Sequence, residues 1–187
     1  DKQGSLYLST GDGANPDSNP DRNNLAQNLQ NLKGKILRLD LSESKLDPEI
    51  IAYGFRNPFG MSIDSKDRMF IPVCGRKSAE AVYFITDLYS NVPLNMGWPF
   101  FEGSLRKKNS SLLFNNVSAP IFQTNKRPGC LSSGVYLDDI QSFLFADWYG
   151  TIRLLKQTEN SDWYVYHKYT QSSPITSFGF DKKTKKI

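Results

Sequence analysis

Short stretches in which apolar side chains recur at every second residue run along almost the whole chain. The clearest is residues 35–41, "KILRLDL", whose three leucines share one face, the pattern of a half-buried strand. Turn-forming sequences such as Gly11-Asp12-Gly13 separate several of the stretches. Ten similar runs occupy residues 5–10, 49–54, 60–64, 68–73, 81–86, 133–138, 143–147, 151–156, 163–169 and 175–180. This spacing predicts an all-β protein of antiparallel hairpins or meanders.

One segment, residues 20–32, has a helical spacing of leucines, but its many polar residues predict a short helix at best. A length of 187 residues suits a single domain, residues 1–187. At about four strands per blade, the predicted strands would make roughly three blades of a propeller, fewer than the four to eight that close a ring. A sandwich and part of a propeller therefore both fit the pattern.

Composition excludes several classes of function. The net charge of +4 is dispersed, and no basic patch interleaved with aromatic residues suggests a nucleic-acid partner. No apolar run has the length of a membrane span. Cys74 and Cys130 are too few for a disulfide framework or a zinc site, and their spacing leaves open whether they pair. Asn109 and Asn116 match the N-glycosylation pattern, which leaves the compartment open.

Five motifs occur in a fixed order and distinguish between the two folds. They are "GSLYLSTGDG" (4–13), "LAQNLQNLKGKILRLD" (25–40), "PEIIAYGFRNPFGMSID" (48–64), "MGWPFFEG" (96–103) and "SSGVYLDD" followed by "FADWYGTIRLL" (132–155). Together they resemble the soluble aldose and glucose/sorbosone dehydrogenase family, whose members are six-bladed propellers dependent on pyrroloquinoline quinone (PQQ), and which includes hedgehog-interacting-protein-like domains. The resemblance implies that the chain is part of a six-bladed β-propeller and corresponds to the C-terminal half of the family's domain.

The "YGFRNPFG" segment is a signature of this fold. The resemblance implies that Arg56 lies partly buried at a blade corner, where its guanidinium donates to loop carbonyls. Pro58 has no N–H to donate, so it ends the strand ladder where the chain must turn. We expect Arg56 to have a structural role and no chemistry.

The family's catalytic base is a histidine that lies upstream of the strand corresponding to residues 5–10. The only histidine here, His167, falls in an alternating run near the C-terminus and does not correspond to that base. The resemblance therefore implies no catalytic residue in this segment.

The loop "CGRKSAE" (74–80) resembles the family segment that supplies backbone carbonyls to a calcium ion bound by PQQ. Gly75 and Arg76 would fill that role, Glu80 would keep the loop's acid, and Trp148 falls near a position that contacts the cofactor. The basic residues that hold PQQ in the glucose dehydrogenase branch are replaced near Trp148, Gln171 and Ser173. An anionic cofactor needs charged donors. The expected cofactors are therefore PQQ and calcium, in a pocket that lacks some of these donors.

Two further signals have alternative interpretations. Asp12, Asp17 and Asp21 are spaced like calcium ligands, but two prolines interrupt the segment, so turns in a surface loop are the alternative. Trp98 and Trp148 suit either packing between blades or stacking on a sugar or quinone.

Two functions follow from the resemblance. In the first, the protein oxidises an aldose hydroxyl with PQQ and calcium. In the second, it is a non-catalytic binding or structural propeller in an extracellular, periplasmic or particle-associated assembly. In both, the expected partners are the remaining propeller blades, from the same chain or another, and a sugar is an expected ligand.

Overall fold

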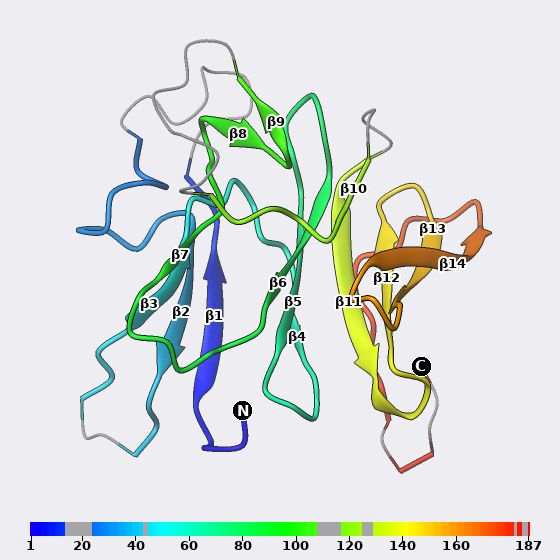
Figure 1. Ribbon diagram of the computed structural model, residues 1–187, viewed down its shortest axis with the longest axis horizontal. Coiled ribbons are helices and arrows are strands. Elements are labelled where there is room, and N and C mark those ends of the chain that lie inside the picture. The colour runs from blue at the N-terminus through cyan, green and yellow to red at the C-terminus, as the bar shows by residue number, and fades with distance from the viewer. Residues whose placement is uncertain (14–23, 43–44, 108–116, 125–128, 182, 185–186) are drawn as a thin grey trace.

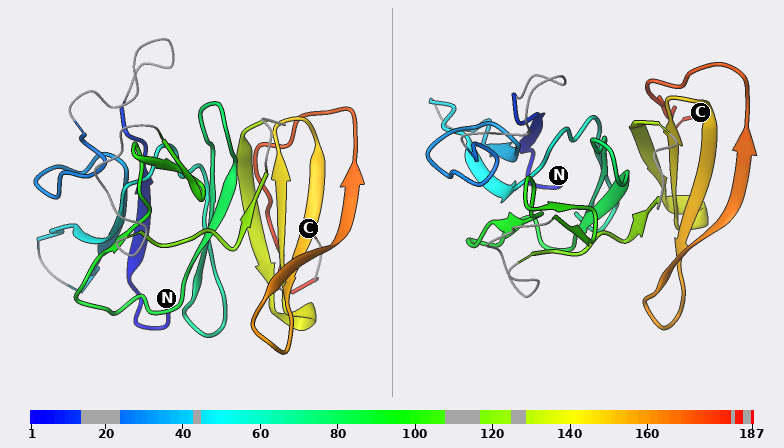
Figure 2. Two further views of the ribbon diagram at one scale, coloured as in Figure 1. Left: turned by 45° about the horizontal axis from the view of Figure 1, so that its top comes forward. Right: turned by 90° about the horizontal axis from the view of Figure 1, so that it is seen from above.

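The computed structural model describes every residue except 14–23, 43–44, 108–116, 125–128, 182 and 185–186 (Figure 1). It contains three four-stranded sheets that stand side by side, as expected of adjacent propeller blades (Figure 2). No helix in this described part is long and apolar enough to cross a membrane. The all-β class and the propeller arrangement are confirmed.

The first sheet has the strand order β1-β2-β3-β7. Its strands are β1 (Leu6–Thr10), β2 (Lys35–Leu39), β3 (Glu49–Tyr53) and β7 (Leu94–Asn95). The first three form an antiparallel meander, and β7 joins β3 in parallel.

The second sheet has the order β10-β6-β5-β4, with all its pairs antiparallel. Its strands are β4 (Ser62–Ile63), β5 (Met69–Val73), β6 (Ala81–Ile85) and β10 (Phe122–Gln123). A short hairpin of β8 (Phe101–Glu102) and β9 (Leu105–Arg106) lies between β7 and β10 in the sequence.

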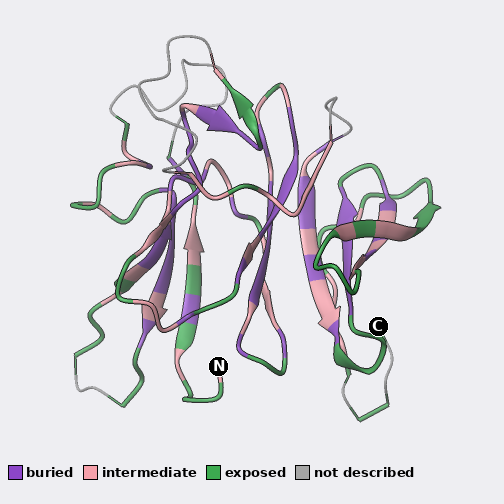
Figure 3. Cartoon of the chain, in the orientation of Figure 1, coloured by how far each residue is buried: buried purple, intermediate pink, exposed green. Residues whose placement is uncertain are grey.

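The third sheet is a simple antiparallel meander in chain order, β11-β12-β13-β14. Its strands are β11 (Leu131–Leu137), β12 (Ser142–Asp147), β13 (Thr151–Gln157) and β14 (Trp163–Thr170), with a 3₁₀ turn η2 (Asp138–Ile140) between the first two. Of these, β14 at the edge is the most exposed, whereas the inner strand β12 is buried throughout (Figure 3).

Two apolar cores lie between the sheets. Ile36, Phe55 and Ile71 belong to the first core, between the first and second sheets. Phe143 and Leu155 belong to the second, between the second and third sheets. We call these two interfaces the first junction and the second junction.

Strand β5 contributes to both junctions. Met69, Ile71 and Val73 pack into the first core and Phe70 into the second, as alternating side chains on a strand require. The Phe70 ring stacks at 4.9 Å from Tyr136 and 4.8 Å from Phe143, measured between ring centroids. A strand buried on both faces is therefore the shared wall of two blades.

The longer strands coincide with the predicted apolar runs, whereas the two-residue strands β7, β8, β9 and β10 lie outside them. Two predicted segments are not formed. Residues 175–180, predicted as a strand, have no regular structure; the Ser132 hydroxyl donates to the carbonyl of Ile175 there. The helix predicted within residues 20–32 is also wrong in its described part, where residues 24–32 form turns. The Asn24 carbonyl accepts from the amides of Gln27 and Asn28 at 2.9 and 3.1 Å, but no helix continues from that turn.

Strand β2 is not half-buried as its alternation predicted. Lys35, Ile36, Leu37 and Leu39 are all buried, because the strand is central in the first sheet. Lys35 is completely buried, and its ammonium donates to the carbonyls of Leu25 and Ala26, both at 3.0 Å, and to that of Lys33. These carbonyls satisfy the charge, so the strand can be buried on both faces.

Candidate functional site

The candidate site is a pocket of about 190 Å³ at one end of the second junction, where β5 and β12 finish and β11 begins. We call it the junction pocket. Its lining residues are Arg56, Cys74, Gly75, Glu80, Gly129, Cys130, Trp148 and Tyr149.

Three of the four predicted cofactor residues meet in this pocket. Gly75 and Glu80 come from the loop after β5, and Trp148 comes from the turn after β12. Arg76 does not line it, because the loop turns the backbone amide of Arg76 toward Glu102. Three of the residues named from the sequence therefore line one pocket, and their role in binding a cofactor stays a prediction.

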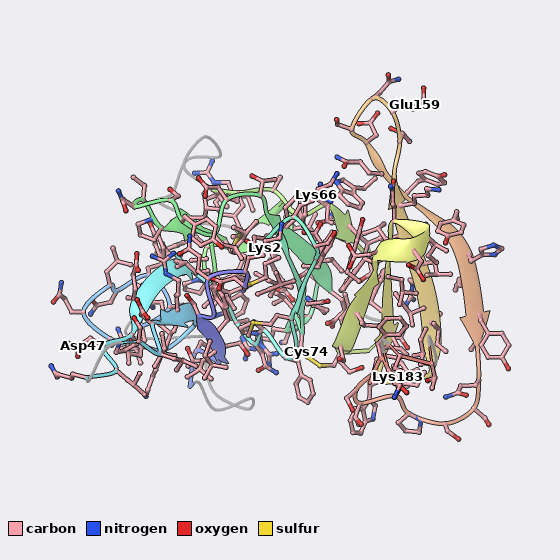
Figure 4. All side chains as sticks on the ribbon, turned by 90° about the horizontal axis from the view of Figure 1, so that it is seen from below. Lys2, Asp47, Lys66, Cys74, Glu159 and Lys183 are labelled. Carbon is pink, nitrogen blue, oxygen red and sulfur yellow. A yellow bond between two sulfur atoms is a disulfide. The ribbon has the colours of Figure 1, made fainter. Side chains whose placement is uncertain are left out.

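Cys74 and Cys130 form a disulfide that links the second sheet to the third (Figure 4). Their Cα atoms are 4.5 Å apart, although the residues are separated by 56 positions in the sequence. Both cysteines line the junction pocket, so the crosslink forms part of its wall. The sequence had left this pairing open.

Arg56 lies at the blade corner that the sequence predicted. It follows β3, and the next residues pair with the end of β5 through a bridge between Pro58 and Val73. Its Nη1 donates to the carbonyl oxygen of Cys74 at 3.1 Å, which confirms the predicted bond to a loop carbonyl. No other oxygen in the described part of the chain accepts from this guanidinium, so its remaining donors are available at the pocket.

Arg56 also lines a second, much smaller cavity of about 20 Å³ in the first junction. Trp98 and Glu102 are among its other lining residues. A cavity of this size has room for about one water molecule. The guanidinium thus lies between the small cavity of the first junction and the larger junction pocket of the second.

Glu80 is 2% exposed, and its carboxylate accepts hydrogen bonds from two backbone amides. The donors are Gly75 at 2.9 Å and Leu131 at 3.2 Å, one from each side of the second junction. Burial raises the pKa of Glu80, and the two amides and the nearby Arg56 oppose that rise only in part. This acid therefore ties the pocket loop to β11.

Glu102 binds the backbone of the loop that lines the junction pocket, a role that the sequence did not indicate. One of its oxygens accepts from the amides of Lys77 at 2.7 Å and Ser78 at 2.9 Å, and from that of Arg76. Burial opposes ionisation of Glu102, but these amides and Lys107 outweigh it and lower the pKa of the carboxyl. Nothing in "PFFEG" marks this role, because the amides it binds lie more than 20 residues away.

The charged groups around the pocket loop do not form a metal cluster. Among the described residues, no group of three or more His, Cys, Asp or Glu side chains is placed to hold an ion. Glu80 and Glu102 both accept from backbone amides. Calcium ligation by the carbonyls of Gly75 and Arg76 stays a prediction.

The two candidate tryptophans have different environments. Trp98 is 3% exposed; its Nε1 donates to Asp12 at 2.7 Å, and the ammonium of Lys107 lies 3.6 Å from its ring centroid. Trp148 is 46% exposed at the pocket, in a turn whose next residue, Tyr149, donates its amide to Asp147 at 3.0 Å. Trp98 is thus a packing residue, and Trp148 is open to a ligand.

The remaining sequence candidates lie elsewhere. Asp12 is buried against Trp98 instead of lying in a surface loop, whereas Asp17 and Asp21 fall outside the described residues. The glycosylation motifs at Asn109 and Asn116 also fall outside them. His167 is exposed on β14, opposite Leu154, and does not line the junction pocket.

A sequence-family model described as Glucose / Sorbosone dehydrogenase matches residues 1–112. The HIPL2 protein of Arabidopsis thaliana is 36% identical over 145 residues, an alignment that covers 62% of this chain and 20% of HIPL2. The HIPL1 protein of the same plant is 32% identical over 127 residues, covering 54% of this chain and 17% of HIPL1. The chain spans about a fifth of the length of these relatives.

Solved structures show the same fold at low sequence identity. The PQQ-bound aldose sugar dehydrogenase of Streptomyces coelicolor aligns with a TM-score of 0.63 and 22% identity, over 87% of this chain and 45% of its own. The apo-form soluble aldose sugar dehydrogenase of Escherichia coli gives 0.64 and 17%, over 89% and 51%. The holo PQQ domain of pyranose dehydrogenase from Coprinopsis cinerea gives 0.65 and 14%, over 90% and 54%.

Proposed function

The chain belongs to the glucose/sorbosone dehydrogenase family, and on that premise we propose that it forms one wall of the cofactor pocket of a PQQ-dependent sugar dehydrogenase. The protein would oxidise an aldose hydroxyl. The observation that carries the proposal is the convergence of Gly75, Glu80 and Trp148 on one pocket beside Arg56. Arg56 follows β3, Gly75 and Glu80 lie in the loop after β5, and Trp148 lies in the turn after β12. The fold alone does not require these three segments to share a pocket with an available guanidinium.

The residues of the junction pocket fit a planar anion. The guanidinium of Arg56 has unused donors in a flat fork that matches a carboxylate. Trp148 and Tyr149, which are 46% and 64% exposed, offer aromatic surface at the rim. The carboxylate of Glu80 accepts from the amides of Gly75 and Leu131, which offset part of its repulsion of a carboxylate ligand. When bound, PQQ supplies a quinone that accepts hydride from the sugar.

The chain's own residues would bind, orient and exclude water. Arg56 is held by the carbonyl of Cys74, so its fork has a fixed direction toward the pocket. Trp148 is anchored by its amide, which donates to the carbonyl of Cys130 at 2.9 Å. The family's proton-abstracting base has no counterpart among the lining residues, so other parts of the protein would have to supply it. No group of three or more His, Cys, Asp or Glu side chains among the described residues is placed to hold calcium, so a calcium ion would depend on backbone carbonyls.

A second candidate function is a non-catalytic binding propeller in an extracellular or periplasmic assembly. One observation favours it: Arg56 is the single cationic side chain among the described residues that line the pocket, whereas a cofactor with several carboxylates is expected to need more. The disulfide between Cys74 and Cys130 suits an oxidising compartment for either function.

Calorimetric titration of the intact protein with PQQ, with and without calcium, tests the proposal. We expect micromolar or tighter binding, and a loss of at least tenfold in affinity for Arg56→Met, because the charged fork is removed. Arg76→Met is the matched control and should bind as the wild type does, since Arg76 does not line the pocket. A screen of aldoses with a dye as electron acceptor would follow.

Absence of binding at high micromolar PQQ would refute the dehydrogenase proposal and favour the non-catalytic one. Binding that Arg56→Met leaves unchanged would place the cofactor elsewhere. Trp148→Ala provides a second readout: the exposed indole contributes little to stability, so its removal should weaken PQQ binding and leave the melting temperature nearly unchanged.

A further inference from the structure

A second pocket, of about 150 Å³, lies at the opposite end of the second junction. We call it the basal pocket. Arg68 precedes β5 at the basal pocket and Cys74 follows β5 at the junction pocket. A strand rises about 3.3 Å per residue, so the two sites are roughly 20 Å apart. The basal pocket is therefore separate from the proposed cofactor site.

Three segments from two blades form the walls. The β4–β5 turn contributes Lys66 and Arg68, the end of β11 contributes Tyr136, and the β13–β14 hairpin contributes Lys156 and Trp163. Lys66 lies on the face shown in Figure 4. Because both sides of the pocket come from within this chain, it does not depend on a neighbouring blade.

Hydrogen bonds and packing fix these walls in place. The carboxylate of Asp138 accepts from the amide of Ser65 at 3.1 Å, which ties η2 to the β4–β5 turn across the junction. The Trp163 ring packs edge to face with Phe70 and Phe84, with centroids 5.6 and 5.2 Å apart. A pocket held in this way needs little rearrangement to bind a ligand.

The charges of the basal pocket leave two cations unpaired. Asp64 is buried and receives Nε and Nη2 of Arg68 at 2.7 and 2.6 Å, which neutralises both groups. Lys66 and Lys156 have no carboxylate within ion-pair distance in the described part of the chain. Asp138 is the other acid at the site, so the lining has a net positive charge.

The remaining lining groups suit a hydroxylated ring. Gln141 offers an amide, and Gln157 offers its carbonyl oxygen and its second N–H, because its Nε2 already donates to the carbonyl of Ser161 at 3.1 Å. Trp163 offers an aromatic surface. The pocket, of about 150 Å³, has room for one small ring. A lone inorganic anion would leave the amides and the indole without a contact.

We propose that the basal pocket binds a single sugar ring that carries a negative charge, as a carboxylate or a phosphate. Lys66 and Lys156 bind the charged group, and Gln141, Gln157 and Trp163 contact the ring. This binding is independent of the proposed oxidation at the junction pocket.

Calorimetry of the intact protein with glucuronate, glucose 6-phosphate, glucose and sodium sulfate tests the proposal. At least one of the two charged sugars should bind tenfold or more tightly than both glucose and sulfate. The double variant Lys66→Met/Lys156→Met should lose at least tenfold in that affinity. Lys168→Met removes an exposed lysine of β14 outside the pocket and should bind as the wild type does.

Two controls separate this site from the cofactor site and from misfolding. Arg56→Met should leave the affinity for the charged sugar unchanged, whatever it does to PQQ; a loss there would place the sugar in the junction pocket and overturn the proposal. Thermal melts should show that the lysine variants fold, since Lys66 is exposed and Lys156 only half-buried. Equal affinity for glucose or sulfate, or full binding by the double variant, would also overturn it.

Discussion

The two junctions between the sheets solve the same packing problem with different residues. The first satisfies a buried carboxylate internally: Glu102, which lines its small cavity, accepts from three backbone amides. The second has an aromatic core and a disulfide, and pockets of about 190 and 150 Å³ open at its ends.

This difference separates structure from function. In the first junction the polar groups are buried and hydrogen-bonded, and the cavity holds about one water. In the second, Arg56, Lys66 and Lys156 present donors or charges that other protein groups do not take up. The comparison teaches that the buried charge of Glu102 is taken up by internal hydrogen bonds, whereas the accessible cations that line the two pockets keep donors for a ligand.

The largest predicted effect concerns the outer faces that neither junction covers. Leu6 and Leu8 on β1 are 47% and 44% exposed, and Tyr169 on β14 is 64% exposed. Residues 1–187 expressed alone should therefore fail to fold as a stable monomer, because these faces would expose apolar side chains and strand edges that further blades would cover. Size-exclusion chromatography and urea unfolding would check this, and a monodisperse, cooperatively unfolding monomer would contradict it.

Next in size is Lys35→Met, which tests a buried and hydrogen-bonded charge in the first sheet. The substitution leaves the carbonyls of Leu25, Ala26 and Lys33 without their buried donor, so the free energy of unfolding of the intact protein should fall by about 3 to 5 kcal/mol. Lys45→Met is the control: its ammonium is 81% exposed and its ion pair with Asp47 should contribute less than about 1 kcal/mol. Equal effects of the two variants in urea unfolding would remove the contrast.

Loss of the disulfide tests the second junction. Cys74→Ala/Cys130→Ala should lower the free energy of unfolding by about 2 to 4 kcal/mol, because the crosslink restricts the unfolded chain over 56 positions. A thiol reductant should lower the stability of the wild type and not that of the double variant. No change in either experiment would show that the aromatic core alone holds the second junction.

The smallest effect is a pH dependence in the first junction. Burial lowers the pKa of Lys107 from 10.5 to about 8, against the opposing effect of Glu102. Between about pH 8 and 10.5 the unfolded chain keeps a proton that the folded protein has lost, so the free energy of unfolding should rise with pH there. We expect a rise of about 1 to 2 kcal/mol, allowing for the favourable contact of the ammonium with Trp98.

The measurement for this last prediction compares the wild type with Lys107→Met across that pH range. The variant lacks the titrating group, so the free energy of unfolding of the wild type should rise with pH relative to that of the variant. Parallel curves would mean that Lys107 stays protonated in the folded protein.

The strands were largely predictable because alternation is a local property. Residues 35–41 showed the limit: the pattern predicted the strand but not the burial of Lys35, which depends on carbonyls from the turn at residues 25–33. Residues 175–180 alternate equally well yet form no ladder; the hydroxyl of Ser132 on β11 donates to the carbonyl of Ile175, a side-chain bond in place of backbone pairing.

The site was predictable where a motif carried it and not where tertiary pairing did. The resemblance to the family named Gly75, Glu80 and Trp148, and the structure brings them to one pocket; that they bind a cofactor stays a prediction. The assignment of Arg76 depended on loop direction, which is set by the distant carboxylate of Glu102. The expectation that Arg56 has a structural role fits its bond to the Cys74 carbonyl, and its unused donors at the pocket are the basis of the ligand role proposed above.

The disulfide also determines what a proteolytic nick can do to this protein. Cys74 and Cys130 close a covalent ring that contains β6, β7, the β8–β9 hairpin and β10. Cleavage of any one peptide bond within that ring leaves the two fragments joined. A nicked molecule would therefore migrate as one species until a reductant is added, and both halves of the junction pocket would stay attached to each other.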